Sequence, residues 1–244
     1  MTTRRLFVPP ERLVGSSLLV TGGDHRYLAR VLRVRPGQAV TLFDGTGGEV
    51  EARVGRVAAA ETELLLGERR SPAVFQGASP IVPLVLLAAV PRGGRMDILV
   101  QKTSELGVAR IVPVLTSRSV ARPEAGRQAR WEKIAREAAR QCGRADVPAV
   151  DPPTELAAAL ASELPPLRLA LYEREHSRAL AAALDEPRPT AILVGPEGGF
   201  SEAEMTAAGE AGFVAVGLGP RILRAETAAI VAAALVQQAY GGLG

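Results

Sequence analysis

Two stretches decide the fold of this chain, namely Leu193-Val194-Gly195-Pro196-Glu197-Gly198-Gly199-Phe200 and Leu218-Gly219-Pro220-Arg221-Ile222-Leu223-Arg224-Ala225-Glu226-Thr227. Each follows an apolar run of strand length, residues 190–194 and residues 213–218. Loops that follow parallel strands emerge at the carboxyl edge of the sheet, where α/β folds bind small molecules. The sequence therefore predicts an α/β fold in which the two loops face one pocket.

The first loop is rich in glycine, which lets a flat group approach the backbone closely, and Pro196 stiffens the turn. This composition suits a heterocycle that is read by main-chain hydrogen bonds. Ser201 is the expected N-cap of the next helix, and Glu204 completes a capping box. Taken alone, the same residues are equally typical of an ordinary strand-to-helix turn.

The second loop places charges where an apolar helix begins. Arg221, Arg224 and Glu226 precede residues 228–240, which are apolar on nearly every side and predict a helix buried all round. Bringing these charges out of water costs free energy, so either a charged substrate or a structural ion pair is expected at this point.

The first seventy residues predict a small β-barrel, because short strands alternate with turns. The expected strands are residues 18–20, 39–43, 49–57 and 63–66. Between them, Asp24 is expected to cap a helix with Leu28, Val31 and Leu32 facing inward. Arginines at positions 26, 30 and 33 then share one exposed face, either as a surface that follows phosphates or as a solvated basic face.

The pattern changes after residues 71–80, which are rich in small residues and proline, to an alternation of strands and helices. We therefore expect one domain over residues 1–72 and a second over residues 73–244. In the second, residues 81–90 and 110–115 predict strands. Helices are predicted over residues 96–106, ended by Gly107, and over residues 127–142.

Composition limits the classes of function. The chain has 244 residues, 47% of them hydrophobic, and a net charge of +3. One cysteine, Cys142, and two histidines give no zinc-type ligand cluster, so we expect no metal. The N-terminus lacks the apolar core of a secretory signal, and no apolar stretch is long enough to span a bilayer. We therefore expect a cytoplasmic protein with no membrane partner.

Further segments, together with the two loops, carry a resemblance to a known family. They are Gln101-Lys102-Thr103-Ser104-Glu105-Leu106-Gly107-Val108, Ser117-Arg118-Ser119, residues 131–144, Arg5-Leu6-Phe7-Val8 and residues 25–37. The chain resembles the bacterial ribosomal RNA small subunit methyltransferase E family over nearly its whole length. Members methylate N3 of a uridine in 16S ribosomal RNA.

The resemblance implies a SPOUT-type α/β knot, a deep trefoil knot that binds S-adenosylmethionine, after a small PUA-like β-barrel RNA-binding domain. It also implies a homodimer, and 16S ribosomal RNA or the small ribosomal subunit as partner. The hydrophobic pattern alone predicts an unknotted doubly wound sheet, because knots are rare.

Under this resemblance the two loops enclose the cofactor, and residues of the first domain contact RNA. The expected cofactor-binding residues are Gly195, Glu197, Gly198, Gly199, Leu218, Gly219, Ile222 and Leu223. A further loop near Glu173 is expected to contribute. The expected RNA-binding residues are Arg5, Arg26, Arg30 and Arg33.

The chemistry of uracil suggests the catalytic residues. N3 carries a proton and attacks a methyl group only as that proton leaves, so the site must stabilise an anion or accept the proton. We expect Arg224 to stabilise the developing charge and Glu226 to position Arg224 or accept the proton. Glu197 is a competing base. A structural reading also stands, in which Glu226 interacts with the helix dipole and pairs with Arg224.

Two other functions stay open from the sequence. A related methyltransferase acting on another RNA nucleoside would keep the same cofactor loops. A non-catalytic RNA-binding or ribosome-assembly protein would keep only the pocket. No Walker loop and no Gly-x-Gly-x-x-Gly fingerprint follows a predicted strand, which disfavours nucleotide hydrolysis and dinucleotide binding.

Overall fold

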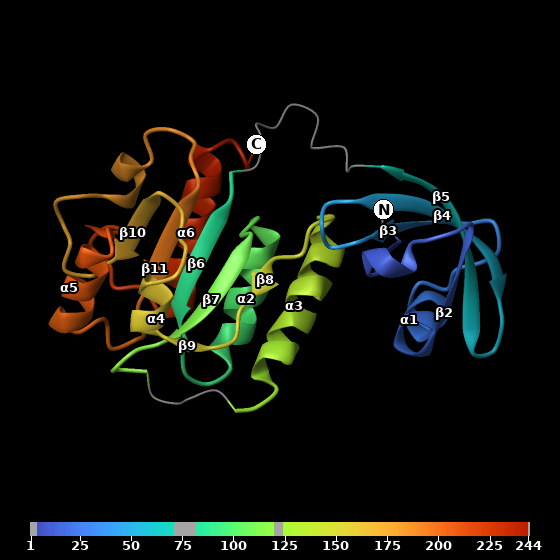
Figure 1. Cartoon of the computed structure of the whole chain (residues 1–244), viewed down its shortest axis with the longest axis horizontal. Coiled ribbons are helices and arrows are strands. Elements are labelled where there is room, and N and C mark those ends of the chain that lie inside the picture. The colour runs from blue at the N-terminus through green and yellow to red at the C-terminus, as the bar shows by residue number, and fades with distance from the viewer. Residues whose placement is uncertain (1–3, 71–81, 120–123, 244) are drawn as a thin grey trace. The chain divides into compact units, whose positions relative to one another are not determined.

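A computed structural model describes residues 4–70, 82–119 and 124–243. The chain divides into two compact units, one of Met1–Gln76 with Ala139–Val147 and one of Gly77–Ala138 with Pro148–Gly244. Figure 1 shows the elements of both units. The expected boundary between residues 72 and 73 lies outside the described residues. The sequence placed residues 139–147 with the second domain, whereas in the structure they group with the first.

The first unit is a five-stranded sheet in the order β1-β3-β4-β5-β2. Its strands are β1 (Arg5–Phe7), β2 (Ser17–Thr21), β3 (Ala39–Phe43), β4 (Glu49–Val57) and β5 (Glu61–Arg70). Only the β1–β3 pair is parallel. All five strands contribute to a single apolar core around Leu28 and Leu42, both fully buried, so the sheet curls round its own interior. Among the described strands, β1 and β2 form the edges.

The helical segment of the first unit differs from the expected regular helix. A short helix α1 (Gly22–Arg26) leads into a π-helical turn, η2 (Tyr27–Val31), and Thr21 is the N-cap in place of Asp24. Leu28 is buried as predicted, but Val31 is 67% exposed, so the prediction that it faces inward was wrong. The wider π turn changes the angle between successive residues, so Val31 no longer follows Leu28 onto the inner face. The single turn η1 (Pro10–Arg12) precedes β2.

The second unit is a parallel sheet in the order β12-β10-β11-β6-β7-β8, with β9 beside β7. Its strands are β6 (Leu84–Ala89), β7 (Arg110–Leu115), β8 (Ala149–Val150), β9 (Thr154–Glu155), β10 (Leu167–Leu171), β11 (Thr190–Val194) and β12 (Val214–Val216). All recorded pairs are parallel, so every strand ends at the same edge. The predicted α/β fold with a parallel sheet is confirmed.

Helices cover both faces of this sheet. They are α2 (Arg95–Glu105), α3 (Arg127–Cys142), α4 (Leu156–Leu160), α5 (Glu202–Glu210) and α6 (Ala225–Ala239), with a short turn η3 (Leu180–Ala183). On one face α6 packs against α2, β6 and β11. On the other, α4 packs against β7 and α5. Strands between two helical layers are buried on both sides, which explains why all six residues of β6 are buried.

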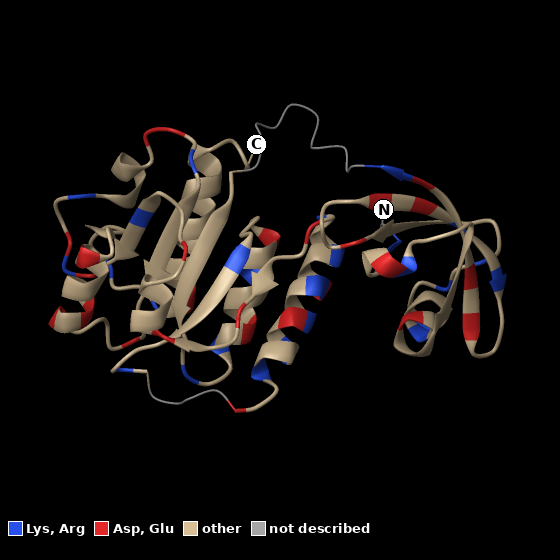
Figure 2. Cartoon of the chain, in the orientation of Figure 1, with Lys and Arg blue, Asp and Glu red and all other residues tan. Residues whose placement is uncertain are grey.

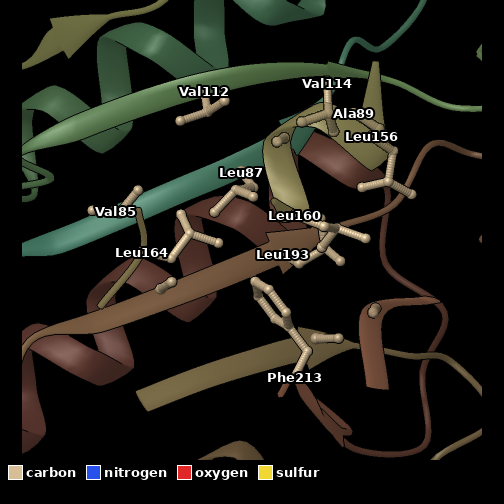
Figure 3. Packing of buried hydrophobic residues seen from close by; sticks show 14 of the residues in the cluster. Val85, Leu87, Ala89, Val112, Val114, Leu156, Leu160, Leu164, Leu193 and Phe213 are labelled. Carbon is tan, nitrogen blue, oxygen red and sulfur yellow. The ribbon is translucent and has the colours of Figure 1, made fainter. Parts of the chain in front are cut away.

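The core beneath α4 and α5 shows the alternation of side chains along each strand (Figure 3). Val85, Leu87 and Ala89 of β6 meet Leu160 of α4 and Phe213, the residue before β12. Because successive side chains of a strand point to opposite faces, the intervening residues of β6 face α6. This double packing fixes the register of the strands and so the positions of the loops that follow them.

The last helix differs from expectation in one respect. α6 begins at Ala225, directly after its N-cap Arg224, and Ala229, Ala232 and Val236 are buried as predicted. The prediction that it is buried all round was wrong for this chain, because Leu235 is 36% exposed. Leu235 of α6 therefore lies partly at the surface of the described part of the chain.

Candidate functional site

The two glycine-bearing loops line one cavity of about 270 Å³ at the carboxyl edge of the parallel sheet. The loop after β11 contributes to one side, and residues 218–223 after β12 contribute to the other. The loop after β10 forms a third wall through Tyr172, Glu173 and His176. Six of the eight residues expected at the cofactor line this cavity: Gly195, Gly199, Leu218, Gly219, Ile222 and Leu223.

The other two expected residues, Glu197 and Gly198, are not in the cavity lining and instead hold the loop from outside. Glu197 Oε1 accepts hydrogen bonds from the Arg95 guanidinium at 2.7 Å and from the Arg92 amide at 3.3 Å. The Gly198 carbonyl accepts a hydrogen bond of 2.6 Å from Arg118. Arg92 and Arg118 from two loops and Arg95 at the start of α2 thus hold the Gly-Pro-Glu-Gly-Gly turn in place.

The predicted capping box after this turn is confirmed. Ser201 Oγ accepts the Glu204 amide at 3.2 Å, and Glu204 accepts the Ser201 amide at 2.8 Å. The amide of Ser117, in the loop after β7, donates to the same carboxylate at 2.7 Å. Burial raises the pKa of Glu204, but these hydrogen bonds outweigh it and hold the pKa below its ordinary value. Glu204 therefore stays ionised, and its hydrogen bonds hold the start of α5 against the loop after β7.

Gly199 occupies a position that requires glycine. Its φ is +67°, and a Cβ atom there would lie 2.5 Å from a carboxylate oxygen of Glu173. The positive φ disfavours every L side chain. The loop after β11 and the loop after β10 are therefore in contact at Gly199.

The two expected catalytic residues stand at the start of α6 in different environments. Arg224 is exposed at the N-cap, whereas Glu226 is 9% exposed in the first turn. The nearest cation recorded for Glu226 is Arg95, whose Nε lies 3.7 Å from Oε1. Glu226 Oε2 is buried and has no hydrogen-bond partner among the described residues. The alternative in which Arg224 pairs with Glu226 therefore has no recorded ion pair to support it.

Sequence reasoning missed Arg95, the first residue of α2, which bridges Glu197 and Glu226. Its guanidinium links the turn after β11 with the start of α6, and so joins the two competing base candidates. Nothing local in the sequence marks it, because both partners are more than a hundred residues away.

Gly217 was also missed, although it directly precedes the second loop. A Cβ atom at Gly217 would lie 2.3 Å from the backbone oxygen of Glu175. Its amide donates to the Arg178 carbonyl at 2.9 Å, and its carbonyl accepts the Leu180 amide at 2.9 Å. The loops after β10 and β12 are thus in backbone contact at this position. The Gly217-Leu218-Gly219 repeat was the available signal.

The four arginines expected to bind RNA lie in the first unit and fall into two groups. Arg26, Arg30 and Arg33 are exposed, although the π turn interrupts the regular helix on which their common face depended. Arg5 is only 6% exposed. Its guanidinium pairs with Glu49 at 2.6 Å, donates to the Arg144 carbonyl at 2.8 Å and stacks over Phe43. Figure 2 shows the charged residues along both units.

Within the described ranges, no group of three His, Cys, Asp or Glu side chains is arranged to hold a metal ion. Over the same residues, no helix has the length and apolar character needed to cross a membrane.

Comparison with known proteins agrees with this geometry. A family model described as an RNA methyltransferase domain matches residues 78–237, and one described as an RNA methyltransferase PUA domain matches residues 20–58. Ribosomal RNA small subunit methyltransferase E of Synechocystis sp. is 33% identical over 95% of this chain and 76% of its own length. The same-named protein of Mycobacterium bovis is 32% identical over 89% of this chain and 85% of its own length.

A solved structure extends the likeness to the whole fold. The Neisseria gonorrhoeae ribosomal RNA small subunit methyltransferase E, bound to S-adenosyl methionine, superposes with a TM-score of 0.88. It is 35% identical, and the match covers 99% of this chain and 100% of that one. The chain therefore belongs to the ribosomal RNA small subunit methyltransferase E family.

Proposed function

We propose that this protein transfers a methyl group from S-adenosylmethionine to N3 of a uridine in 16S ribosomal RNA of the small subunit. The observation that carries the proposal is the single cavity that both loops line at the carboxyl edge of the sheet. A family of ribosomal RNA methyltransferases and a relative bound to S-adenosyl methionine support the same reaction.

The residues of the cavity fit this cofactor. Leu171 and Val194, at the ends of two buried strands, give an apolar floor, and Leu223 adds an apolar side. Backbone groups beside Gly195, Gly199 and Gly219 are open to a planar heterocycle. Glu173 offers a carboxylate at the rim to the cofactor's hydroxyl or ammonium groups. When bound, the cofactor supplies an electrophilic methyl group.

The groups that act on the uracil are proposed from the start of α6. Arg224, exposed and free of a recorded ion pair, stabilises negative charge on the uracil oxygens as the N3 proton leaves. Glu226 has a buried carboxylate oxygen with no hydrogen-bond partner in the part of the chain that the structure describes, and it is our candidate proton acceptor. Glu197 is the weaker candidate, because one of its oxygens already accepts two hydrogen bonds. N3 lies on the pairing edge, so the uridine must be unpaired when it reacts.

The finer architecture follows the family resemblance. We assign residues 73–244 to a SPOUT-type fold with a deep trefoil knot around the cofactor loops. Residues 1–72 are assigned to a PUA-like domain that contacts RNA. Arg26, Arg30 and Arg33 are the proposed contacts, because they are exposed and cationic. We leave Arg5 out of this set, since its guanidinium is buried against Glu49. With ribosomal RNA as the acceptor, we expect the protein to act in the cytoplasm.

A homodimer is supported by the apolar surface of α6 and its neighbour α2. Leu235 of α6 is 36% exposed and Ile98 of α2 is 50% exposed, and the two helices pack together. Exposed apolar surface of this kind is typical of a subunit interface.

The Leu235→Glu variant is expected to shift the protein from dimer to monomer, because a charge would have to be buried at the interface. Light scattering coupled to size-exclusion chromatography measures the mass. Val214, also 36% exposed but on the edge strand β12, provides a matched control, and Val214→Glu should leave the mass unchanged. A Leu235→Glu protein with the mass of the wild type would contradict this interface.

The proposed reaction is tested with small ribosomal subunits that lack the modification. The protein and cofactor carrying a labelled methyl group are incubated with these subunits, and the product nucleoside is mapped. Label on uracil N3 is expected. Label on another nucleoside would favour a different acceptor, and binding of cofactor and RNA without transfer would favour a non-catalytic role. Calorimetric binding of ATP or NAD but not S-adenosylmethionine would refute both the cofactor and the reaction.

A further inference from the structure

A second cavity, of about 150 Å³, lies between the starts of α2 and α3. Arg92 and Gly94 from the loop after β6 line it, with Asp97 of α2 and Arg127 and Trp131 of α3. It shares no lining residue with the cavity between the two glycine loops.

Two buried polar atoms at this cavity have no hydrogen-bond partner among the described residues. Trp131 is 2% exposed, and its Nε1 is an unpaired donor. Asp97 Oδ1 is an unpaired acceptor, while Oδ2 accepts both hydrogen bonds from Arg130, at 2.9 and 2.6 Å. Leaving a buried polar atom unpaired is unfavourable, because the atom has lost its hydrogen bonds to water. An unpaired donor and an unpaired acceptor on two residues that line one cavity favour a ligand that offers both.

The charge around the cavity favours an anionic group on that ligand. Arg92 is exposed at the rim, and the Arg127 guanidinium is 41% exposed. The eleven-residue helix α2 begins here, and its N-cap Gly94 provides no side-chain cap for the first amides. The negative charges present are partly offset: Arg130 pairs with Asp97, and Glu124, 84% exposed, lies 3.7 Å from Arg127.

The second cavity also lies at a position where it could hold RNA next to the base that reacts. β6 and β11 are neighbours in the parallel sheet, so both cavities open at the same edge. Glu197 stands between them, because it follows Pro196 of the first cavity and accepts a hydrogen bond from the amide of Arg92 at the second.

We propose that this second cavity binds the ribose-phosphate backbone of a nucleotide beside the target uridine. The phosphate accepts hydrogen bonds from Trp131 Nε1 and Arg127, and the ribose 2′-hydroxyl donates to Asp97 Oδ1. This assignment requires RNA, since DNA has no 2′-hydroxyl. It rests on the proposed function for the identity of the acceptor.

The first test compares two arginines in similar surroundings. Arg127 and Arg188 are 41% and 43% exposed, and each pairs with a carboxylate three residues earlier, but Arg188 lies at the opposite edge of the sheet, just before β11. Arg127→Gln should weaken binding of unmodified small subunits by about tenfold, as expected for loss of a hydrogen bond to a charged group. The slope of log binding constant against log salt concentration should also become shallower by about one, because one phosphate contact is lost. Arg188→Gln should change neither.

The second test addresses the two buried atoms. A short single-stranded RNA and the DNA of the same sequence compete with the small subunit for the protein. The wild type should prefer RNA, and Asp97→Ala should remove that preference. Trp131→Phe, which removes the donor and keeps an aromatic ring, should weaken RNA and DNA alike. Circular dichroism checks that each variant is folded. If Trp131→Phe does not fold, the comparison of Arg127→Gln with Arg188→Gln tests the proposal instead.

These binding measurements need no methyl transfer, so the subsite and the reaction are tested separately. A wild type that binds RNA with the predicted pattern but does not methylate it would support the subsite and refute the proposed reaction. Equal effects of Arg127→Gln and Arg188→Gln, or an RNA preference unchanged by Asp97→Ala, would overturn the subsite. Calorimetry should give the same S-adenosylmethionine affinity for all variants.

Discussion

Arg224→Ala is expected to lower the rate of methyl transfer at saturating substrates by about 10²–10³-fold, the usual effect of removing one donor that stabilises a developing anion. Arg224 is exposed at the N-cap of α6 and has no recorded ion pair, so its loss removes charge from the site without leaving a buried carboxylate unpaired. The affinity for S-adenosylmethionine should stay near that of the wild type, because Arg224 does not line the cavity. Single-turnover kinetics with unmodified small subunits measure the rate.

Two further variants show whether the effect belongs to this guanidinium. Arg221 lines the cavity, so Arg188, 43% exposed at the opposite edge of the sheet, serves as control, and Arg188→Ala should leave the turnover within a few-fold of wild type. Arg224→Lys should recover part of the rate, because lysine keeps the charge but loses the planar fork of donors. Full turnover by Arg224→Ala would remove this residue from the mechanism.

Gly217→Ala is expected to weaken the binding of S-adenosylmethionine by about tenfold or more and to lower the melting temperature by several degrees. The added Cβ would lie 2.3 Å from the backbone oxygen of Glu175, and no side-chain rotation relieves a clash with backbone. Overpacking of this kind costs about 1–3 kcal/mol, and 1.4 kcal/mol is a factor of ten in affinity. The loops after β10 and β12 must move apart, which opens the cavity between them.

Gly209→Ala is the matched control for this substitution. Gly209 lies in α5, and nothing stands within 4 Å of the Cβ position. Alanine there should stabilise the helix by about 0.5–1 kcal/mol and leave cofactor affinity unchanged. Calorimetry and thermal unfolding followed by circular dichroism measure both variants. A Gly217→Ala protein that binds the cofactor as the wild type does would show that the contact between the two loops is not needed for the pocket.

The elements of this fold were predictable wherever a short-range pattern was strong. The bounds of β3, β4, β7, β11 and α3 match the predicted ranges, because each is an alternating strand, a continuous apolar run of strand length or a helical stripe between turn residues. The phase of the helix near Val31 was not predictable, since a π turn leaves no mark in the hydrophobic pattern. The exposure of Leu235 on α6 was not predictable, because a helix that is apolar on nearly every side does not show which of its residues face the core.

The site was predictable in its loops but not in the contacts that hold them. Glycines and the flanking strands placed six expected residues on one cavity. Arg95 and the cavity beside Trp131 depend on which strands are neighbours, and adjacency of β6 with β11 joins residues about a hundred positions apart. The burial of Arg5 was not predictable, because an arginine in a β-strand has the same sequence signature whether it faces solvent or pairs with a partly buried glutamate.

The hydrogen bond from the amide of Arg92 to Glu197 has a consequence for how the protein handles its two substrates. It joins the rim of the cavity beside Trp131 to the turn that borders the cofactor. We expect a ligand that displaces the Arg92 backbone to shift this turn, so that occupancy of one cavity changes the affinity of the other. Thermodynamic linkage makes such coupling reciprocal. If bound RNA changes the affinity for the cofactor by some factor, the bound cofactor changes the affinity for RNA by the same factor.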